Sequence, residues 1–409
     1  MRKACKPKLL MALCICIVIA ALSTGCWDRR EIEERGFVVA AAVDIVRPEE
    51  AGEAETKDRT EGDMRINLTF QYVVPGRLQG GGGGGGGAGD GNTTGTFTNI
   101  SAEGETIFES ARLMSTKTSR PPFIEHMKLL ILSEEVAESG QLDSVLDVFL
   151  RDNESRRSVK VMVAKGEAKQ ILTVHPKLEK LPAIYINTIS ENNKKSALLL
   201  PETRIGNVQE YLLKKSSFTV QRIMMAGENE VSVKGAAVFD GQGRLAGYFE
   251  DEETEGLNFI TDKIEGGVVR IKWKDKPIDY EIRDSKRSIQ ANAAHPERIE
   301  FTLSVQSKGI IAEAQTQPDF MSPQVIEEVE RKVEEDIERM MMNTISKAQD
   351  ELKKDVLGLG EYLRQQDHRL WKSIEDDWEN GENYFAKSKI DVKANVTVES
   401  PGNVNRTEM

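Results

Sequence analysis

The sequence predicts a multidomain α+β protein of two or three domains, in which mixed and antiparallel sheets pack against helices. The chain has 409 residues, more than one domain usually holds. Strand and helix patterns alternate up to residue 215, whereas strand patterns dominate from 216 to 314. A long helical pattern over 322–357 then precedes a final strand. The predicted division is a leader over 1–25, domains over 26–215, 216–265 and 266–400, and a tail over 401–409.

The first 25 residues have the three-part plan of a secretory signal. Residues 1–8 are basic, 9–22 form an uninterrupted apolar run, and Ser23-Thr24-Gly25 precedes Cys26. At ~1.5 Å per residue the run reaches about 21 Å, short of a hydrocarbon core of roughly 30 Å, which favours cleavage over a permanent anchor. The Gly25-Cys26 junction resembles a lipobox, with Ser23 where that motif usually has leucine. The sequence therefore predicts lipid attachment at Cys26.

Charge and cysteine content exclude several classes of function. The formal net charge is −12, and removing the four basic residues of the leader takes it to −16. Such a chain repels nucleic-acid phosphates and anionic lipid heads, so we expect no nucleic-acid partner and no adhesion to a membrane by charge. The cysteines are Cys5, Cys14, Cys16 and Cys26. The processed chain keeps only the last of these, which excludes intrachain disulfides and cysteine-based metal sites.

The N-terminal domain is predicted to alternate strands and helices. Residues 37–46 are an apolar, β-branched run typical of a buried strand, and 64–74 alternate as in a strand with one buried face. Further strands are predicted over 127–132 and 159–164, and helices over 101–115, 141–150, 167–174, 182–190 and 207–215.

Eight consecutive glycines at 80–87 interrupt this domain. A glycine-rich phosphate loop needs a helix beginning with Lys-Ser or Lys-Thr directly after it, and no such lysine follows. The segment near 76–96 is therefore predicted to be a flexible, disordered insertion at a loop tip.

The remaining chain is predicted to form strands and one long helix. Strands are expected over 221–225, 231–239, 244–249, 268–273, 278–284 and 299–305, with a hairpin turn at Asp240-Gly241-Gln242-Gly243. Ser322 and Pro323 are typical of a helix start, and Gly358 and Gly360 of its end. The apolar stripe of this helix predicts packing on the preceding sheet, with partner binding as the alternative. A short helix near 370–378 and a strand over 390–398 complete the prediction.

The sequence predicts no catalytic, cofactor or metal site. His126, His175, His295 and His368 are far apart and form no zinc-binding pattern, although clustering in space is left open. There is no Gly-x-Ser-x-Gly motif, and lipid would occupy the only cysteine thiol of the processed chain. The acidic run 250–253 is interpreted as a solvated face. We therefore expect a protein without enzymatic activity.

The segment Gly25-Cys26-Trp27-Asp28-Arg29-Arg30-Glu31-Ile32 resembles the mature start of the Ger(x)C lipoproteins, the C subunits of nutrient germinant receptors in endospore-forming bacteria. In that family this segment is followed by an apolar strand that ends in Asp, and Val43-Asp44-Ile45 matches that strand end here. Similar segments occur in the family's order along the chain, and the polyglycine insertion departs from it. The similar segments are 104–108, 126–128, 149–152, 235–239 and 391–392. The single residues Gln349, Asp355, Trp371 and Trp378 also match the family's helical pattern.

The resemblance implies a three-domain α+β fold with no known catalytic activity. It also implies attachment to the outer face of the spore inner membrane and a complex with two membrane-embedded subunits that respond to nutrients. The chain would then be the lipid-anchored subunit needed to trigger spore germination. Trp27 and Asp28, beside the anchor, are predicted to contact the membrane or a partner, and a packed structural role is the alternative.

Two other functions stay open at the level of sequence. A solute-binding lipoprotein that presents a nutrient to a transporter would need a deep pocket between two lobes joined by a hinge. A lipid-anchored cell-wall enzyme would need a histidine and carboxylates in one cleft. The sequence does not decide whether this chain binds a small molecule directly.

Overall fold

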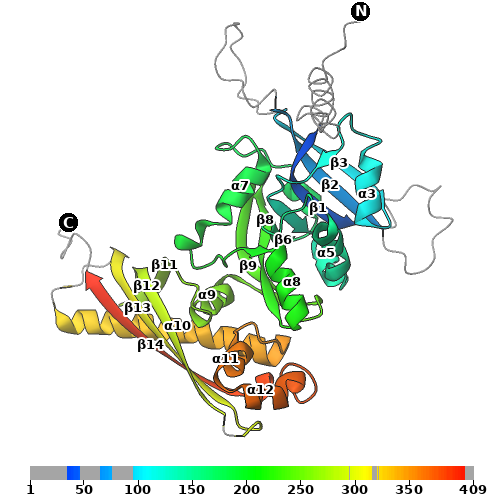
Figure 1. Cartoon of the computed structure of the whole chain (residues 1–409). Coiled ribbons are helices and arrows are strands. Elements are labelled where there is room, and N and C mark those ends of the chain that lie inside the picture. Colours follow the sequence, from blue (N-terminus) through cyan, green and yellow to red (C-terminus); the bar gives the residue numbers. More distant parts are fainter. Residues whose placement is uncertain are drawn as a thin grey trace, which may run out of the picture.

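The computed structural model describes residues 35–46, 65–75, 95–293, 295–315, 320 and 322–400. Two sheets lie in separate halves of the molecule, and the helix α9 (Asp251–Ile260) lies between them (Figure 1). The glycine-rich residues 76–94, the leader and the tail over 401–409 lie outside the described residues, so the predictions for them stay predictions.

Among the described residues, the first sheet has ten strands and is mixed. Its main order is β10-β9-β8-β6-β5-β1-β2-β3, in which β1, β5, β6 and β8 are parallel neighbours and the other pairs are antiparallel. The strands are β1 (Gly36–Ile45), β2 (Ile66–Val73), β3 (Phe97–Gly104), β5 (Leu129–Leu132), β6 (Lys160–Ala164), β8 (Phe218–Gly227), β9 (Glu230–Phe239) and β10 (Leu245–Phe249), with β4 (Pro122–Phe123) beside β1 and β7 (Thr203–Arg204) beside β6.

Helices cover both faces of this sheet, which explains why its central strands are apolar throughout. One face packs on α3 (Ile107–Met114), α4 (Glu134–Glu138), α5 (Leu142–Arg151) and α8 (Ile205–Lys214). The other face packs on α6 (Ala168–Ile171) and α7 (Pro182–Ile189), and the short turn η3 (Asn192–Lys194) follows α7.

The second sheet has the order β11-β12-β13-β14, with β13 and β14 parallel. Its strands are β11 (Gly267–Trp273), β12 (Lys276–Asn292), β13 (Glu300–Ala314) and β14 (Lys389–Ser400). The long helix α10 (Pro323–Ser346) continues into the π-helical turn η4 (Lys347–Leu352) and buries its apolar stripe against this sheet. Four short helical segments then precede β14: α11 (Leu359–Gln366), α12 (His368–Ile374), η5 (Glu375–Asp377) and α13 (Tyr384–Lys387).

One hydrophobic core joins the two halves of the molecule. Ala236 and Val238 of β9 and Phe249 of β10 belong to the same buried cluster as α9, α10 and the second sheet. A Cβ atom at Gly256 of α9 would lie 2.2 Å from Thr344 Oγ1 of α10, so only glycine permits this close crossing. The halves are therefore joined by a packed interface.

The predicted α+β class, with mixed sheets and a long C-terminal helix, is confirmed. The strands of the predicted middle domain, β8 to β10, extend the first sheet through the pairing of β8 with β6. The division into three domains at residues 215 and 265 stays a prediction.

Several details of the prediction are wrong; the helices α4 and α11, for example, were not predicted. Residues 101–104 continue β3 beside β2, so the helix predicted over 101–115 begins only at Ile107, with Thr106 as its N-cap. The acidic run 250–253 begins the helix α9, which the sequence reading missed; Glu250 is its N-cap, and acids stabilise a first helical turn. The long helix ends at Leu352 instead of 357, because Lys353 adopts a left-handed conformation with φ 55°.

Candidate functional site

The predicted lipid-attachment residue Cys26 and the predicted contact residues Trp27 and Asp28 lie outside the described residues. The described chain enters β1 at Gly36, whose amide donates to the carbonyl of Pro121 at 3.0 Å. Figure 1 places β1 in the half of the molecule opposite to β14. The roles of the three N-terminal residues therefore stay predictions.

Among the described residues, a cleft of about 1100 Å³ lies between the two halves. We call it the interlobe cleft. The helix α8 and the first residues of β8 form one wall. The segment after η4, with the start of α11 and the residues around Trp378, forms the other wall. Asp355, Trp371 and Trp378, which carry part of the family resemblance, all line it.

Asp355 is a buried carboxylate that organises the second wall. Its Oδ1 accepts hydrogen bonds from the amides of Leu357 at 3.2 Å and Leu359 at 3.1 Å. Its Oδ2 accepts from the amide of Gly360 at 2.5 Å and from the Trp378 indole at 2.8 Å. Burial raises the pKa of Asp355, although these donors oppose the shift. The carboxylate therefore satisfies amides at the start of α11, which would otherwise be unpaired.

Glu379 links the two walls of the interlobe cleft. Its Oε1 accepts from the amide of Asp355 at 3.1 Å, and its Oε2 accepts from the hydroxyl of Ser217, directly before β8. Lys354 Nζ lies 4.0 Å from the same carboxylate. Burial, and then the charge of Asp355, raise the pKa of Glu379 to about 7. A single side chain thus joins the first sheet to the C-terminal helices.

Aromatic packing fixes the second wall. Trp378 meets Trp371 with ring centroids 5.8 Å apart and Phe301 of β13 at 6.4 Å, both edge to face. A Cβ atom at Gly360 would lie 2.6 Å from the indole nitrogen of Trp378, so this glycine makes room for the ring. Trp378 is therefore buried in the core beneath the cleft, whereas Trp371 is only partly buried.

The charged side chains that line the cleft mostly have partners already. Lys214 pairs with Glu210 at 2.7 Å and Arg364 with Glu361 at 2.5 Å. Arg287 of β12 donates from its guanidinium to the carbonyl of Ile260 at 2.9 Å, and burial lowers its pKa. These ion pairs leave the cleft without a strong excess of either charge.

Within the described residues, two of the four histidines pack against aromatic rings. His126 packs against Phe37 and Phe123, and His175 packs against Phe97. No histidine lines the interlobe cleft within the described residues. No group of three or more His, Cys, Asp or Glu side chains there could hold a metal ion.

Other residues behind the resemblance also have architectural roles. Asp44 is buried at β1 and accepts from the amides of Ala168 at 2.6 Å and Lys169 at 2.9 Å, at the start of α6. Burial raises its pKa to about 6. Gln349 donates to the carbonyls of Phe385 at 2.7 Å and Ser388 at 2.9 Å, which positions α13 before β14.

Sequence reasoning missed Glu379 and Ser217, because they are 162 residues apart and follow no local pattern. A signal existed for Asp355, which precedes two glycines at the end of a helical stripe. Within the described parts of the chain, every helix is too short or too polar to cross a membrane.

Two family models together match most of the chain. "Spore germination protein N-terminal domain" matches residues 28–224, and "Spore germination B3/ GerAC like, C-terminal" matches residues 234–402. The match includes Trp378, Asp355 and Gln349 in the second model and Asp44 in the first.

Curated relatives and a solved structure are similar over nearly their full length. Spore germination protein YndF of Bacillus subtilis (strain 168) is 30% identical, covering 99% of both chains. Spore germination protein B3 of the same organism is 28% identical, covering 91% of this chain and 90% of that protein. The crystal structure of the GerBC protein has a TM-score of 0.58 at 22% identity, covering 89% of this chain and 99% of that one, which shows the shared fold. The chain therefore belongs to the GerAC/GerBC-like family of spore germination proteins.

Proposed function

We propose that this chain is the lipid-anchored, non-enzymatic subunit of a nutrient germinant receptor. It would trigger spore germination by assembling with two membrane-embedded receptor subunits on the extracytoplasmic face of the spore inner membrane. The observation that carries the proposal is Cys26 directly after an apolar leader, at the head of the octapeptide that resembles the mature start of the Ger(x)C lipoproteins. Membership of a spore germination family over nearly the whole chain supports it.

The joint between the halves supports a role in assembly. A shared hydrophobic core and the contact of Glu379 with Ser217 hold the two halves together. A body of this kind presents its surfaces in a constant arrangement, as a docking module requires. A solute binder that closes around its ligand needs a hinge of few residues instead.

The anchor explains how such a body would find membrane partners. Two acyl chains on Cys26 suffice for stable attachment at ~0.8 kcal/mol per buried methylene. Confinement to the membrane surface raises the effective concentration of the body beside any membrane-embedded subunit. The acidic body itself contributes no attraction to anionic lipids.

A pair of cysteine substitutions tests the proposal in spores. Cys26→Ala removes the thiol that would carry lipid, whereas Cys16→Ala changes a leader residue that processing would discard. Membranes from dormant spores are fractionated, the chain is purified, and co-purifying membrane proteins are identified by mass spectrometry. We expect Cys26→Ala to move the chain out of the membrane fraction, to abolish co-purification and to slow nutrient-triggered germination several-fold.

The Cys16→Ala spores should match the wild type in all three measurements. Spore formation should be normal in both strains, because the proposed role begins only at germination. Membrane retention and normal germination in the Cys26→Ala strain would contradict the proposal.

The interlobe cleft favours a second candidate, a lipoprotein that binds a solute and presents it to a transporter. The cleft has about 1100 Å³ and lies between two halves, as that function requires. Trp371 and Trp378 line it, so a bound solute should change the intrinsic fluorescence of the full-length chain in detergent. Saturable changes with single amino acids or sugars would favour the second candidate, and unchanged fluorescence would favour the assembly role.

A further inference from the structure

The outer edge of β14 has a regular pattern of backbone amides. The amide of Lys389 donates to the carbonyl of Ile299, directly before β13, at 3.0 Å. In a parallel ladder the residues of a strand alternate between facing the neighbour and facing outward. The amides of Ile390, Val392, Ala394, Val396 and Val398 therefore face outward, toward the edge at which no other described strand pairs with β14.

Three of these amides are covered by carboxylates of α10. Glu338 accepts from Ala394 at 2.8 Å, Glu334 from Val396 at 2.9 Å and Glu330 from Val398 at 2.8 Å. The glutamates are four residues apart on α10, which corresponds to a rise of about 6 Å along the helix. Their partner amides are two residues apart on β14, about 6.6 Å along the strand, so the two spacings match. We call this row of three glutamates the carboxylate ladder. It protects the edge from pairing with another strand.

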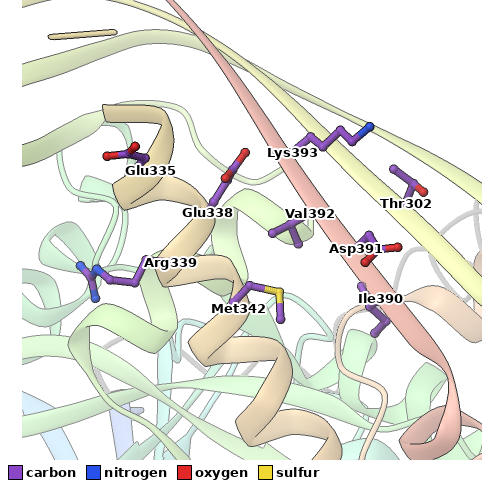
Figure 2. A pocket seen from close by; sticks show the side chains of 9 residues that line it. All are labelled: Thr302, Glu335, Glu338, Arg339, Met342, Ile390, Asp391, Val392 and Lys393. Carbon is purple, nitrogen blue, oxygen red and sulfur yellow. The ribbon is translucent and has the colours of Figure 1, made fainter. Parts of the chain in front are cut away.

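The carboxylate ladder stops at Met342. This residue is the next four-residue step along α10, opposite Val392, and its side chain is 39% exposed. Where the structure describes the chain, no side-chain acceptor meets the amides of Ile390 and Val392. A groove of about 610 Å³ lies at this point, between α10 and the start of β14 (Figure 2).

The groove combines apolar surface with acidic groups on its helical side. Met342 and Glu338 extend from α10, and Ile390 and Val392 lie on the strand that faces them (Figure 2). Arg339 points away from β14 and is engaged by Glu252 and Asp336, each at 2.7 Å. Glu335 is paired with Arg331. Glu338 therefore supplies the main charge that faces the open edge from α10.

We propose that the open edge of β14 at Ile390 and Val392 binds an extended segment of a partner protein as an added β-strand. The amides and carbonyls of these two residues would pair with the segment's backbone. On the side facing α10, an apolar side chain would lie over Met342 and a basic side chain would meet Glu338. This interaction surface is separate from lipid anchoring and from the interlobe cleft.

The proposal predicts that one carboxylate closes the edge. Met342→Glu extends the carboxylate ladder by one step, which places an acceptor beside the Val392 amide. Met342→Ala removes the same side chain but leaves the edge open, so it is the matched control. Because position 342 is partly exposed, both variants should unfold at temperatures close to the wild type. Val392→Pro is a second variant that closes the edge, because proline has no amide hydrogen to donate at position 392. An edge strand tolerates proline where the amide faces outward.

The probe is a fluorescent, capped peptide of sequence Val-Thr-Lys-Thr-Val-Thr-Lys, in which valine and lysine share one face of a strand. Its binding to the full-length chain in detergent is measured by fluorescence anisotropy. We expect the peptide to bind the wild type and Met342→Ala, and to bind Met342→Glu and Val392→Pro at least tenfold more weakly. A peptide methylated at the pairing amides should not bind.

The direction of the Met342→Glu effect separates strand pairing from simple charge attraction. The substitution adds a negative charge, so attraction of the basic peptide to an acidic surface would become stronger, not weaker. Equal or tighter binding to Met342→Glu would overturn the proposal. Absence of binding to both the wild type and Met342→Ala would overturn it as well.

Discussion

Protonation of Glu379 should have a large effect on stability. Its pKa is about 7 in the folded chain and near 4.5 in an exposed glutamate, so the folded chain keeps this proton up to a higher pH than the unfolded chain does. The contribution of Glu379 to the free energy of unfolding should therefore fall as pH rises from 4.5 to about 7, by up to about 3 kcal/mol. Glu379→Gln keeps an acceptor for the Asp355 amide and removes the charge. Glu255 and Asp44 also have raised pKa values, about 7 and about 6, and keep their own contributions. We therefore expect the substitution to make this pH dependence less steep and to stabilise the chain above pH 7, in urea unfolding at several pH values.

Glu382→Gln is the control for this measurement, because that glutamate is exposed and its pKa is lowered by Lys387. It should keep the pH dependence of the wild type. If Glu379→Gln also kept it, the carboxyl group would not be the buried link between the halves that the structure describes.

Single residues show where sequence reading succeeds and where it stops. Asp355, Gln349 and Trp378 could be singled out from the resemblance, but their partners are backbone groups and rings set by tertiary contacts. The sequence could not indicate that Asp355 satisfies the start of α11. Nor could it indicate Glu379, whose partner Ser217 belongs to the other half. The lipid-attachment residue Cys26 could be predicted because leader chemistry is local.

At the scale of elements, the carboxylate ladder makes a specific prediction about β14. Glu334→Ala removes the acceptor of the Val396 amide and should speed its hydrogen exchange by roughly tenfold, the effect of one charge-assisted hydrogen bond. Glu335→Ala, one position along α10 and without an amide partner among the described residues, should leave this exchange unchanged. Equal effects of both substitutions on Val396 would show that α10 does not cap the edge.

Elements with a strong period were predicted well, because one buried face determines their pattern. The alternation in β2 and the apolar stripe of α10 are examples. The helix α9 was missed since its buried residues include Thr254, Gly256 and Asn258, which give no apolar stripe. The strand residues 101–104 were assigned to the following helix because they carry no apolar alternation, and only pairing with β2 makes them a strand.

At the scale of the whole molecule, the shared core predicts that both halves unfold together. Phe249 of the first sheet and Phe259 of α9 belong to the same cluster as Ile337 of α10. Three of the four tryptophans, Trp273, Trp371 and Trp378, lie in the second half, so fluorescence reports on that half, whereas far-ultraviolet circular dichroism reports on both. We expect equal urea midpoints by the two methods. Separate midpoints would mean that the halves are independent.

The arrangement of the whole molecule was the least predictable from sequence. In the order β10-β9-β8-β6-β5-β1-β2-β3, β8 lies beside β6, although α7 and α8 separate the two strands in the sequence. No local sequence pattern specifies that pairing. The α+β class followed from the alternation of patterns alone. The joint between the halves did not, because its residues come from β9, β10, α9 and α10.

The central claim is that this chain works from a lipid anchor at Cys26. The most direct test is mass spectrometry of the N-terminal peptide of the chain isolated from native spore membranes. We predict a mature chain that begins at Cys26 and carries a diacylglyceryl group on the thiol. A free thiol at Cys26, or a leader still attached through residues 1–25, would contradict the account.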